Sequence, residues 1–223
     1  MILHLIAGQT ENHPVYQELQ ISNVGRQYDF LLSVVSASLK VGKPFLSMHI
    51  VKALNFQAIT CLHTNAGEFR PCEVTVGSSH APPRFYLVQA LMDDFVNTVN
   101  RHLESTDPLV LASYVLWKLN HIHPFINGNG RTARAACYFI LCLKFEKLLP
   151  GTKIIPELLN RDHDEYELAL READKAGDLS QLQKLLHRLL QEQISSAEPP
   201  PPLPARRFNK RLLAARQVAK PSL

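Results

Sequence analysis

Apolar residues recur along much of the chain at the three- and four-residue spacing of amphipathic helices. Between residues 84 and 103 they occupy Val88, Leu91, Met92, Phe95, Val96, Val99 and Leu103. This spacing predicts a helix over about 84–103 with one buried stripe. The same pattern predicts helices near 25–40, 46–63, 160–174 and 178–194. We therefore expect a mainly α fold.

Two further helices are predicted on either side of a glycine-rich segment. The first begins behind Asp107, an N-cap followed by proline, and ends near His121. The second, about 130–147, has no charged residue from Ala135 to Leu143. Because a helix that is apolar on every side must be surrounded by other elements, we expect it at the centre of a helical bundle.

One stretch departs from the helical pattern. Gly67 and Gly77 bracket a run that contains Val74, Thr75 and Val76. Since β-branched residues favour strands and glycines favour turns, the run predicts a short β-hairpin. On these residues alone, an ordinary surface hairpin is the favoured interpretation.

The glycine-rich segment carries the candidate chemistry. Residues 123–134 read His-Pro-Phe-Ile-Asn-Gly-Asn-Gly-Arg-Thr-Ala-Arg. A glycine-rich turn that leads into a helix favours anions, because free backbone N–H groups and the helix dipole point the same way. Arg131 and Arg134 add forked cationic donors one turn apart, which predicts a polyphosphate. His123 could take a proton from a hydroxyl near neutral pH, so the segment predicts a group-transfer site.

These residues resemble the motif of the Fic family, His-x-Phe-x-(Asp/Glu)-Gly-Asn-Gly-Arg-x-x-Arg. Every fixed position agrees except that Asn127 replaces the acid. Weaker similarities lie at Ala66-Gly67-x-x-Arg70 and around Tyr166, so the resemblance covers about residues 45–190. It implies a Fic-type helical bundle with a short β-hairpin flap before the motif helices.

The resemblance implies a role for each matching residue. His123 is similar to the general base that activates a hydroxyl of the target protein, and Phe125 to a core anchor of the loop. Tyr166 resembles a residue beside the adenine, with a half-buried helix aromatic as the equal alternative. The implied ATP- and phosphate-binding residues are Gly128, Asn129, Gly130, Arg131 and Arg134.

The flap implied by the resemblance docks the target protein. Its strand comprises Cys72, Glu73, Val74, Thr75 and Val76. A strand edge of this kind holds the target main chain and brings its hydroxyl near His123. A target protein on the flap is therefore the expected partner.

The activity that the resemblance implies is that of a protein adenylyltransferase, a nucleotidyltransferase that moves AMP from ATP to a Ser, Thr or Tyr hydroxyl. ATP and Mg²⁺ are the implied cofactors. Magnesium prefers charged oxygen ligands, so the neutral amide of Asn127 is a weaker metal ligand than the family acid. Two alternatives stay open: a nucleotide-binding, target-docking protein with little catalysis, and a phosphoryl-transferring toxin like the related Doc proteins.

Regulation is the second departure from the family pattern. Many members carry an inhibitory helix with (Ser/Thr)-x-x-x-Glu-(Gly/Asn). Here Glu11 is the one glutamate followed by Gly or Asn, and Ala7 stands at the hydroxyl position. We therefore expect one of two arrangements. Either a separate antitoxin-like protein supplies the inhibitor, or Asn127 makes inhibition of the site unnecessary.

Charge divides the chain into two parts. Residues 1–198 hold 18 basic and 20 acidic residues, whereas residues 199–223 hold six basic and no acidic ones. The folded part is therefore not a basic nucleic-acid binder. The prolines from residue 199 onward cannot continue a packed helix. We expect a Fic domain with an N-terminal extension over 1–195 and a Pro-rich linker with a basic tail over 196–223.

The tail has three interpretations. Residues 201–206 fit PxxPxR, a ligand pattern for SH3-type partners. A basic C-terminus also resembles export signals of secreted bacterial effectors. A solvated linker and tail is the plainer interpretation.

Cysteines and apolar runs bear on location. Cys137 and Cys142 fall within the apolar helix, and with Cys61 and Cys72 they form no CxxC pair, which favours buried thiols in a reducing compartment. No apolar run approaches the roughly 20 residues of a membrane span, and the start lacks the features of a signal peptide. We expect a cytoplasmic protein, or a secreted effector acting in a host cytosol, with no membrane partner.

A zinc site is a separate question raised by the motif. His121 and His123 form a His-x-His pair. No Cys, Asp or Glu close to them in the sequence completes a zinc ligand set, so we expect no metal bound by this pair.

Overall fold

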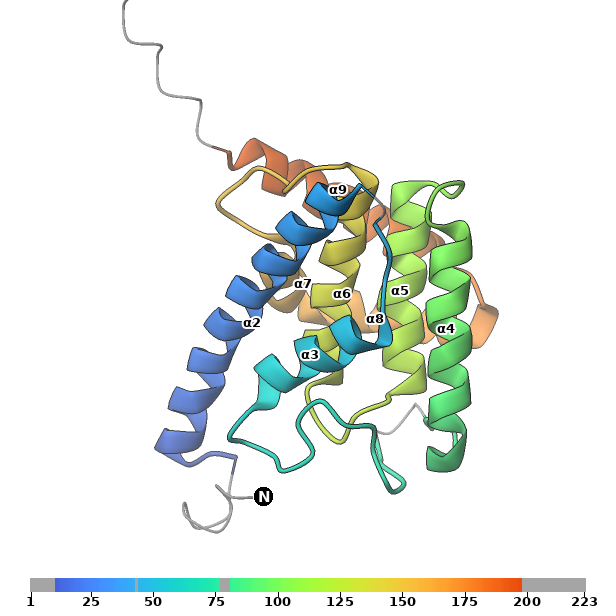
Figure 1. Cartoon of the computed structure of the whole chain (residues 1–223). Helices are drawn as coiled ribbons and strands as arrows, with labels where there is room; N and C mark the ends of the chain where they lie inside the picture. The colour runs from blue at the N-terminus through green and yellow to red at the C-terminus, as the bar shows by residue number, and fades with distance from the viewer. Residues whose placement is uncertain (1–10, 43, 77–80, 198–223) are drawn as a thin grey trace, which may run out of the picture.

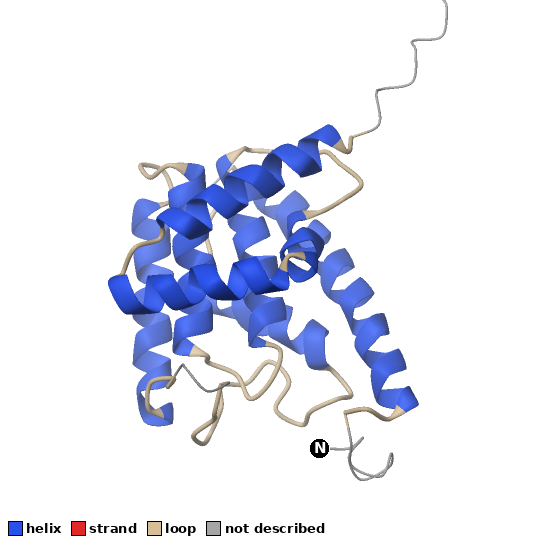
Figure 2. Ribbon diagram, turned by 180° about the vertical axis from the view of Figure 1, so that it is seen from behind, coloured by secondary structure: helices blue, strands red, loops and turns tan. Residues whose placement is uncertain are grey.

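The computed structural model describes residues 11–42, 44–76 and 81–197, and in these ranges the chain consists of helices joined by loops (Figure 2). The elements are α2 (Pro14–Val41), α3 (Met48–Ile59), the 3-10 helix η1 (Phe85–Leu87), α4 (Val88–His102), α5 (Pro108–Ile122), α6 (Asn129–Lys144), α7 (Ile155–Arg161), α8 (His163–Ala176) and α9 (Ser180–Ser195). The prediction of a mainly α fold is confirmed.

Helix α6 lies at the centre of the bundle, with α2, α3, α5 and α7 packed around it (Figure 1). Every residue from Ala135 to Leu143 is buried. This run carries no charge, so its burial requires no desolvation of an ion. Burial raises the pKa of the Cys142 thiol to about 11, which keeps it protonated and unreactive near neutral pH. The predicted central helix is confirmed.

Helices α4 and α5 follow the sequence patterns closely. The buried face of α4 consists of Val88, Met92, Phe95 and Val99, the core of the predicted stripe. Asp107 caps α5, because its carboxylate accepts hydrogen bonds from the backbone N–H groups of Leu109 (2.8 Å) and Val110 (3.2 Å). Both predictions are confirmed, with η1 forming the first turn before α4.

Helix α2 is longer than its apolar pattern predicted, since it begins at Pro14 and not near residue 25. Two of its buried positions are amides, Asn23 and Gln27. Their side chains donate to the carbonyl oxygens of Thr60 (2.8 Å), the C-cap of α3, and of Leu54 (2.9 Å), in the middle of that helix. Polar groups that are satisfied in this way can be buried without showing in a hydrophobic pattern.

Helix α7 was not predicted. It has only seven residues, and the proline at its second position reads equally well as a loop residue. Its buried residues Ile155, Leu158 and Leu159 close the core beside α6 and α9.

The predicted hairpin flap is not shown: in the described part of the segment, residues 67–76 form turns, bends and unassigned loop, with isolated bridge positions at Phe69 and Val76. The segment pairs with the motif loop instead. Phe69 forms an antiparallel bridge with Phe125, and the Arg70 N–H donates to the Pro124 carbonyl at 2.8 Å. Residues 77–80 lie outside the described residues. The loop and this segment lie together at one end of the bundle (Figure 1).

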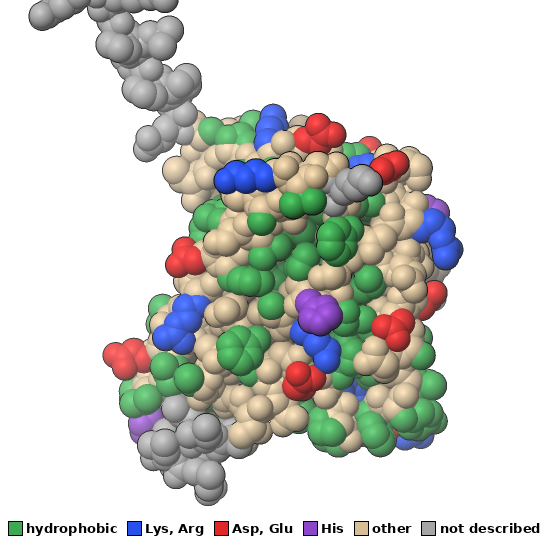
Figure 3. Space-filling model, in the orientation of Figure 1, with side chains coloured by type: hydrophobic (Ala, Val, Ile, Leu, Met, Phe, Trp, Pro, Cys, Tyr) green, Lys and Arg blue, Asp and Glu red, His purple; other side chains and the backbone are tan. Residues whose placement is uncertain are grey.

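The outer surface and the chain ends add two observations. On the face seen in Figure 3, acidic and basic side chains are scattered among apolar ones. No helix in the described ranges is long and apolar enough to span a bilayer.

Helix α9 runs across the back of the bundle and ends at Ser195 (Figure 2). The Pro-rich linker and basic tail, with their SH3-type partner, lie almost entirely outside the described residues and stay predictions.

Candidate active site

The loop between α5 and α6 holds His123 in a fixed backbone conformation. His123 is the C-cap of α5 with φ 51°, in the left-handed region, and its N–H donates to the Leu119 carbonyl at 3.0 Å. Its own carbonyl accepts from Nε of Arg70 at 2.8 Å. Arg70 is 2% exposed and also donates to the carbonyls of Cys72 and Pro83. One buried guanidinium thus ties the histidine to the segment predicted as the flap.

Phe125 anchors the loop in the core, as predicted. Its side chain is fully buried, with its ring centroid 5.6 Å from that of Phe69. The Asn129 side chain closes the turn, because its oxygen accepts from the Phe125 N–H (2.9 Å) and its amide group donates to the Phe125 carbonyl (2.8 Å). The Asn129 side chain therefore shapes the loop, and its backbone begins α6.

Gly128 is the N-cap of α6 and lies against α3. It has φ 76°, and a Cβ there would lie 2.7 Å from Ile59 Cγ2 and 3.1 Å from Asn55 Nδ2. Only glycine combines this backbone with this approach. The turn thus brings the first N–H groups of the central helix to the surface, the arrangement that favours anions.

Asn55 on α3 joins three parts of the site, and the sequence analysis missed it. Its amide group donates to the Asn127 carbonyl (2.9 Å) and to the Thr132 hydroxyl (3.2 Å), while its oxygen accepts from the Gly67 N–H (3.0 Å). The side chain is fully buried. Asn55 is one of several polar residues in α3, so its position gave no signal of this role.

Both motif arginines are held near the start of α6. Arg131 donates to the Ala58 carbonyl (2.7 Å) and to the Asn127 side-chain oxygen (3.2 Å), and Arg134 donates to the Asn160 side-chain oxygen (3.3 Å). Burial lowers the pKa of both guanidinium groups, although they stay charged. Two desolvated cations at the positive end of a helix dipole repel that end, and a bound anion relieves the repulsion.

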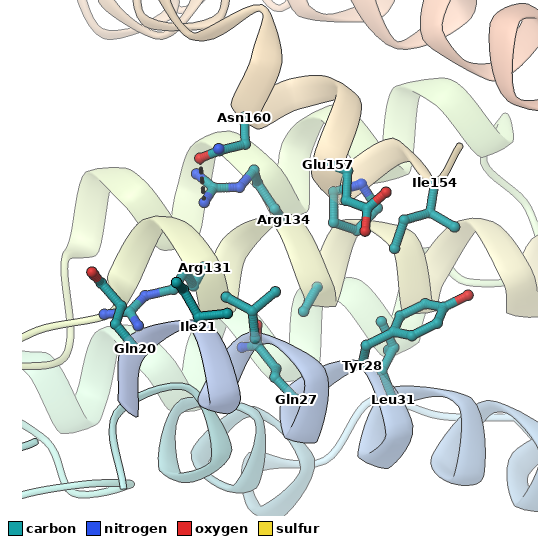
Figure 4. Close-up of a pocket in the computed structure, with 13 residues that line it drawn as sticks. Gln20, Ile21, Gln27, Tyr28, Leu31, Arg131, Arg134, Ile154, Glu157 and Asn160 are labelled. Atoms are coloured by element: carbon teal, nitrogen blue, oxygen red, sulfur yellow. Dashed lines mark hydrogen bonds between the residues drawn. The ribbon is translucent and has the colours of Figure 1, made fainter. Parts of the chain in front are cut away.

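Two cavities meet at Arg134. The first, which we name the histidine pocket, has a volume of about 250 Å³ and is lined by Val76, Trp117, Asn120, His121, His123, Gly130, Arg134, His163, Tyr166, Glu167, Leu170, Arg171 and Asp174. The second, the arginine pocket, has about 410 Å³ and is lined by Gln20, Ile21, Val24, Gln27, Tyr28, Leu31, Arg131, Arg134, Ala135, Ile154, Pro156, Glu157 and Asn160 (Figure 4).

The histidine pocket brings together predicted site residues from distant parts of the chain. His123, Gly130, Arg134 and Tyr166 all line it, and so does Val76 from the predicted flap. His123, the start of α6 and a cationic side chain thus share one cavity. Arg131 lines the arginine pocket instead.

Tyr166 is more buried than a typical base-stacking residue. Its side chain is 3% exposed, and its hydroxyl accepts from the Asn120 amide at 2.8 Å. Burial raises the pKa of the phenol, so it stays neutral. The ring forms part of the pocket wall, while its hydroxyl is hydrogen-bonded to Asn120. Contact with a nucleobase stays a prediction.

At the far end of the histidine pocket, Asp174 accepts from Trp117 Nε1 (2.9 Å) and contacts His121 Nδ1 (2.8 Å). The sequence analysis found no acid beside His121, because Asp174 is 53 residues away in the chain. In the described part of the chain, no group of three or more His, Cys, Asp or Glu side chains is placed to hold a metal ion.

Asn127, at the family's acid position, lies between a cation and an anion. Its oxygen faces Arg131, and its amide group donates to Glu11 Oε1 at 3.3 Å. One carboxylate and one amide thus lie side by side at the loop. Magnesium commonly takes one or two carboxylates and completes its shell with phosphate and water, so the Glu11 carboxylate fits a magnesium ion that arrives with a nucleotide, with the Asn127 amide as its neighbour.

The fold and the motif loop define an all-α domain whose central helix begins at an anion-accepting turn between a histidine and two arginines. Residues 45–141 match the model of the Fic/DOC family. The match spans the motif loop together with α3, α4, α5 and most of α6.

Individual relatives agree with the family match. The protein adenylyltransferase Fic of Drosophila persimilis is 48% identical over 69 residues, which are 30% of this chain and 13% of that protein. The protein of the same name from Drosophila mojavensis is 34% identical over 108 residues, 48% of this chain and 21% of that protein. The matches thus span less than a quarter of those relatives.

Solved structures share the fold at low sequence identity. A Fic domain containing signaling protein from Bacteroides thetaiotaomicron has a TM-score of 0.67 at 18% identity, covering 86% of this chain and 76% of that one. Fic-1 of C. elegans has a TM-score of 0.66 at 20% identity, covering 98% and 58%.

Proposed function

We propose that this protein is a protein adenylyltransferase that moves AMP from ATP to a Ser, Thr or Tyr hydroxyl of a target protein. One observation carries the proposal. His123, the start of α6 and Arg134 line one cavity, and Arg134 joins that cavity to Arg131. A base and a polyphosphate site therefore adjoin, as transfer of a phosphate-containing group to a hydroxyl requires. The names of the Drosophila relatives specify AMP as the group.

The nucleotide would lie across the junction of the two pockets. Its nucleoside occupies the histidine pocket beside Tyr166, and its α-phosphate lies at the N–H groups of α6. Arg134, at the junction, and Arg131, in the arginine pocket, bind the β- and γ-phosphates. Magnesium, when bound, would neutralise phosphate charge, and the Glu11 carboxylate beside Asn127 would be the protein group nearest to it.

In the reaction, His123 accepts the proton of the target hydroxyl. The hydroxyl oxygen attacks the α-phosphorus and forms a new P–O bond, while the bond between the α-phosphorus and the oxygen bridging to the β-phosphate breaks. Pyrophosphate leaves with that electron pair, and the two arginines balance its charge. The fixed backbone of His123 keeps the base in position throughout.

The target would dock on the segment from Cys72 to Val76. Residues 73–75 belong to no helix or strand, and Val76, an isolated bridge residue, lines the histidine pocket. An extended target segment paired with this backbone would place its hydroxyl at the pocket mouth. The Arg70 contacts hold the start of the segment against the motif loop.

A binding protein with little turnover is the second candidate, and one observation favours it. The side chain of Asn127 is engaged by Arg131 and Glu11 and carries no charge. A site that holds nucleotide without completing transfer would bind ATP and the target and leave both unchanged.

Intact-mass spectrometry separates the candidates. The full chain is incubated with ATP, Mg²⁺ and fractionated cell lysate, and modified proteins are then identified by mass. A gain of one AMP supports the proposal, and a gain of one phosphate indicates a Doc-like phosphoryl transferase. Nucleotide binding without any gain identifies the binding protein.

A further inference from the structure

Glu11 places a carboxylate at the motif loop from the far end of the sequence. Its Oε1 accepts from Asn127 Nδ2 at 3.3 Å, across 116 positions of sequence, and from the Tyr16 hydroxyl at 3.3 Å. Glu11 helps to raise the pKa of Tyr16 to about 12, after the larger effect of burial. Within the described residues, Glu11 Oε2 makes no hydrogen bond. One oxygen is thus held in place, on a side chain that is exposed.

The position of this carboxylate creates an electrostatic problem for the proposed nucleotide. Asn127 also contacts Arg131, so Glu11 lies one side chain away from a proposed phosphate ligand. Arg131 offsets one negative charge, but ATP carries several, so the carboxylate still repels the polyphosphate unless a further cation lies between them. A divalent ion between two sets of anionic oxygens turns the repulsion into attraction, and hard oxygen ligands are those that magnesium prefers.

We propose that Glu11 is the anionic magnesium ligand of this site, and that Asn127 orients it through its amide N–H. The inference rests on the proposed nucleotide site. The charge that the motif lacks at residue 127 is then supplied by residue 11, and the amide acts as a neighbour that fixes the ligand. Hydrogen bonds of this kind hold metal-binding carboxylates in position.

The test measures how far a divalent ion strengthens nucleotide binding. The non-hydrolysable analogue AMPPNP is titrated into the full chain by calorimetry, once with EDTA and once with Mn²⁺ as a magnesium substitute. The ratio of the two affinities is the metal gain, which reports metal binding in the complex without relying on transfer. The variants are Glu11→Gln, the double variant Glu11→Gln/Asn127→Asp, and the control Glu18→Gln, an exposed glutamate on α2.

The wild type should show a metal gain, and Glu11→Gln should reduce it by about tenfold or more, since it removes the charged ligand. The double variant moves the carboxylate to residue 127 and lets the new amide at residue 11 donate the orienting hydrogen bond, so the gain should return. Glu18→Gln should match the wild type. All variants should keep the wild-type melting temperature to within a few degrees, because residues 11 and 18 are exposed.

Two results would overturn the inference. The first is a metal gain that is absent from the wild type or unchanged in Glu11→Gln. The second is tighter AMPPNP binding by Glu11→Gln to the same extent with EDTA and with Mn²⁺, which would make Glu11 a group that repels the nucleotide. A wild type with a Glu11-dependent metal gain but no AMP transfer would refute the proposed function alone.

Discussion

The two pockets that share Arg134 differ in size and in chemistry, and the two criteria favour different sites. The arginine pocket is larger, about 410 Å³ against about 250 Å³, and lies within the size range typical of ligand sites. The histidine pocket is smaller but holds His123 and the start of α6. Chemistry decides between them, because a cavity without a base cannot activate a hydroxyl. The larger space is where we expect only the distal phosphates.

Removing the base tests most strongly whether the chemistry takes place in the histidine pocket. His123→Ala should lower AMP transfer by at least the roughly 10²–10⁴-fold that a positioned base contributes, while ATP affinity changes by no more than a few-fold. The measurement is single-turnover transfer together with calorimetric binding. His187→Ala on α9, away from both pockets, is the control. Transfer by the His123 variant at the wild-type rate would place the chemistry elsewhere.

Gly128 is the N-cap of α6, whose first residues Gly130 and Arg131 line one pocket each, so changing it should affect both. Gly128→Ala forces a Cβ into contact with Ile59 at φ 76° and should cost about 2–4 kcal/mol of unfolding free energy. Gly177→Ala, at φ 67° with open space around it, should cost only about 1–2 kcal/mol. Denaturant melts compare the two. Equal losses would show that the contact with α3 does not constrain the turn.

The arginines distinguish the pockets by ligand. Arg131→Ala should weaken ATP binding by about tenfold, which is equivalent to losing roughly 1.5 kcal/mol from a charge-assisted contact. AMP binding should be nearly unaffected. This follows because Arg131 lines only the arginine pocket, where the distal phosphates lie. Calorimetry with both nucleotides provides the measurement, with the exposed Arg161→Ala as control. An equal loss for AMP would place the nucleoside in the arginine pocket.

The smallest expected effect concerns Tyr166. Tyr166→Phe keeps the ring in the wall of the histidine pocket and removes the acceptor of the Asn120 amide, so it should cost about 1 kcal/mol of stability. ATP affinity should stay within about twofold of the wild type, which corresponds to a few tenths of a kcal/mol of binding free energy. Tyr28→Phe provides the same change in the arginine pocket. A tenfold loss of ATP affinity for Tyr166→Phe would show that the hydroxyl itself contacts the nucleotide.

Much of the fold could be predicted because its signals are local. The uncharged run of α6 required a central position, and Asp107 marked the start of α5. Helix α2 was underestimated because Asn23 and Gln27 are buried amides, and α7 was missed because it is short. The hairpin was predicted from β-branched residues, but the backbone of Phe69 and Arg70 pairs with the motif loop instead.

The site shows the same division between local and distant signals. The motif gave His123, the glycine turn and both arginines, since they are contiguous in the sequence. Asn55, Arg70 and Glu11 reach that loop from 53 to 116 positions away. Contacts between residues so far apart in the chain produce no recognisable spacing in the sequence. Asn55 was missed, and Arg70 and Glu11 were noted only for their similarity to family patterns, because their contacts with the motif loop depend on the fold.

The direct test of the central claim is where the adenine lies. The full chain is photo-crosslinked with 8-azido-ATP, digested, and mapped by mass spectrometry, with excess ATP as competitor. The account predicts labelled peptides from the walls of the histidine pocket, around Trp117 on α5 or Tyr166 to Leu170 on α8, and loss of the label with ATP. Label on the α2 peptide containing Ile21 to Tyr28, the wall of the arginine pocket, would contradict it.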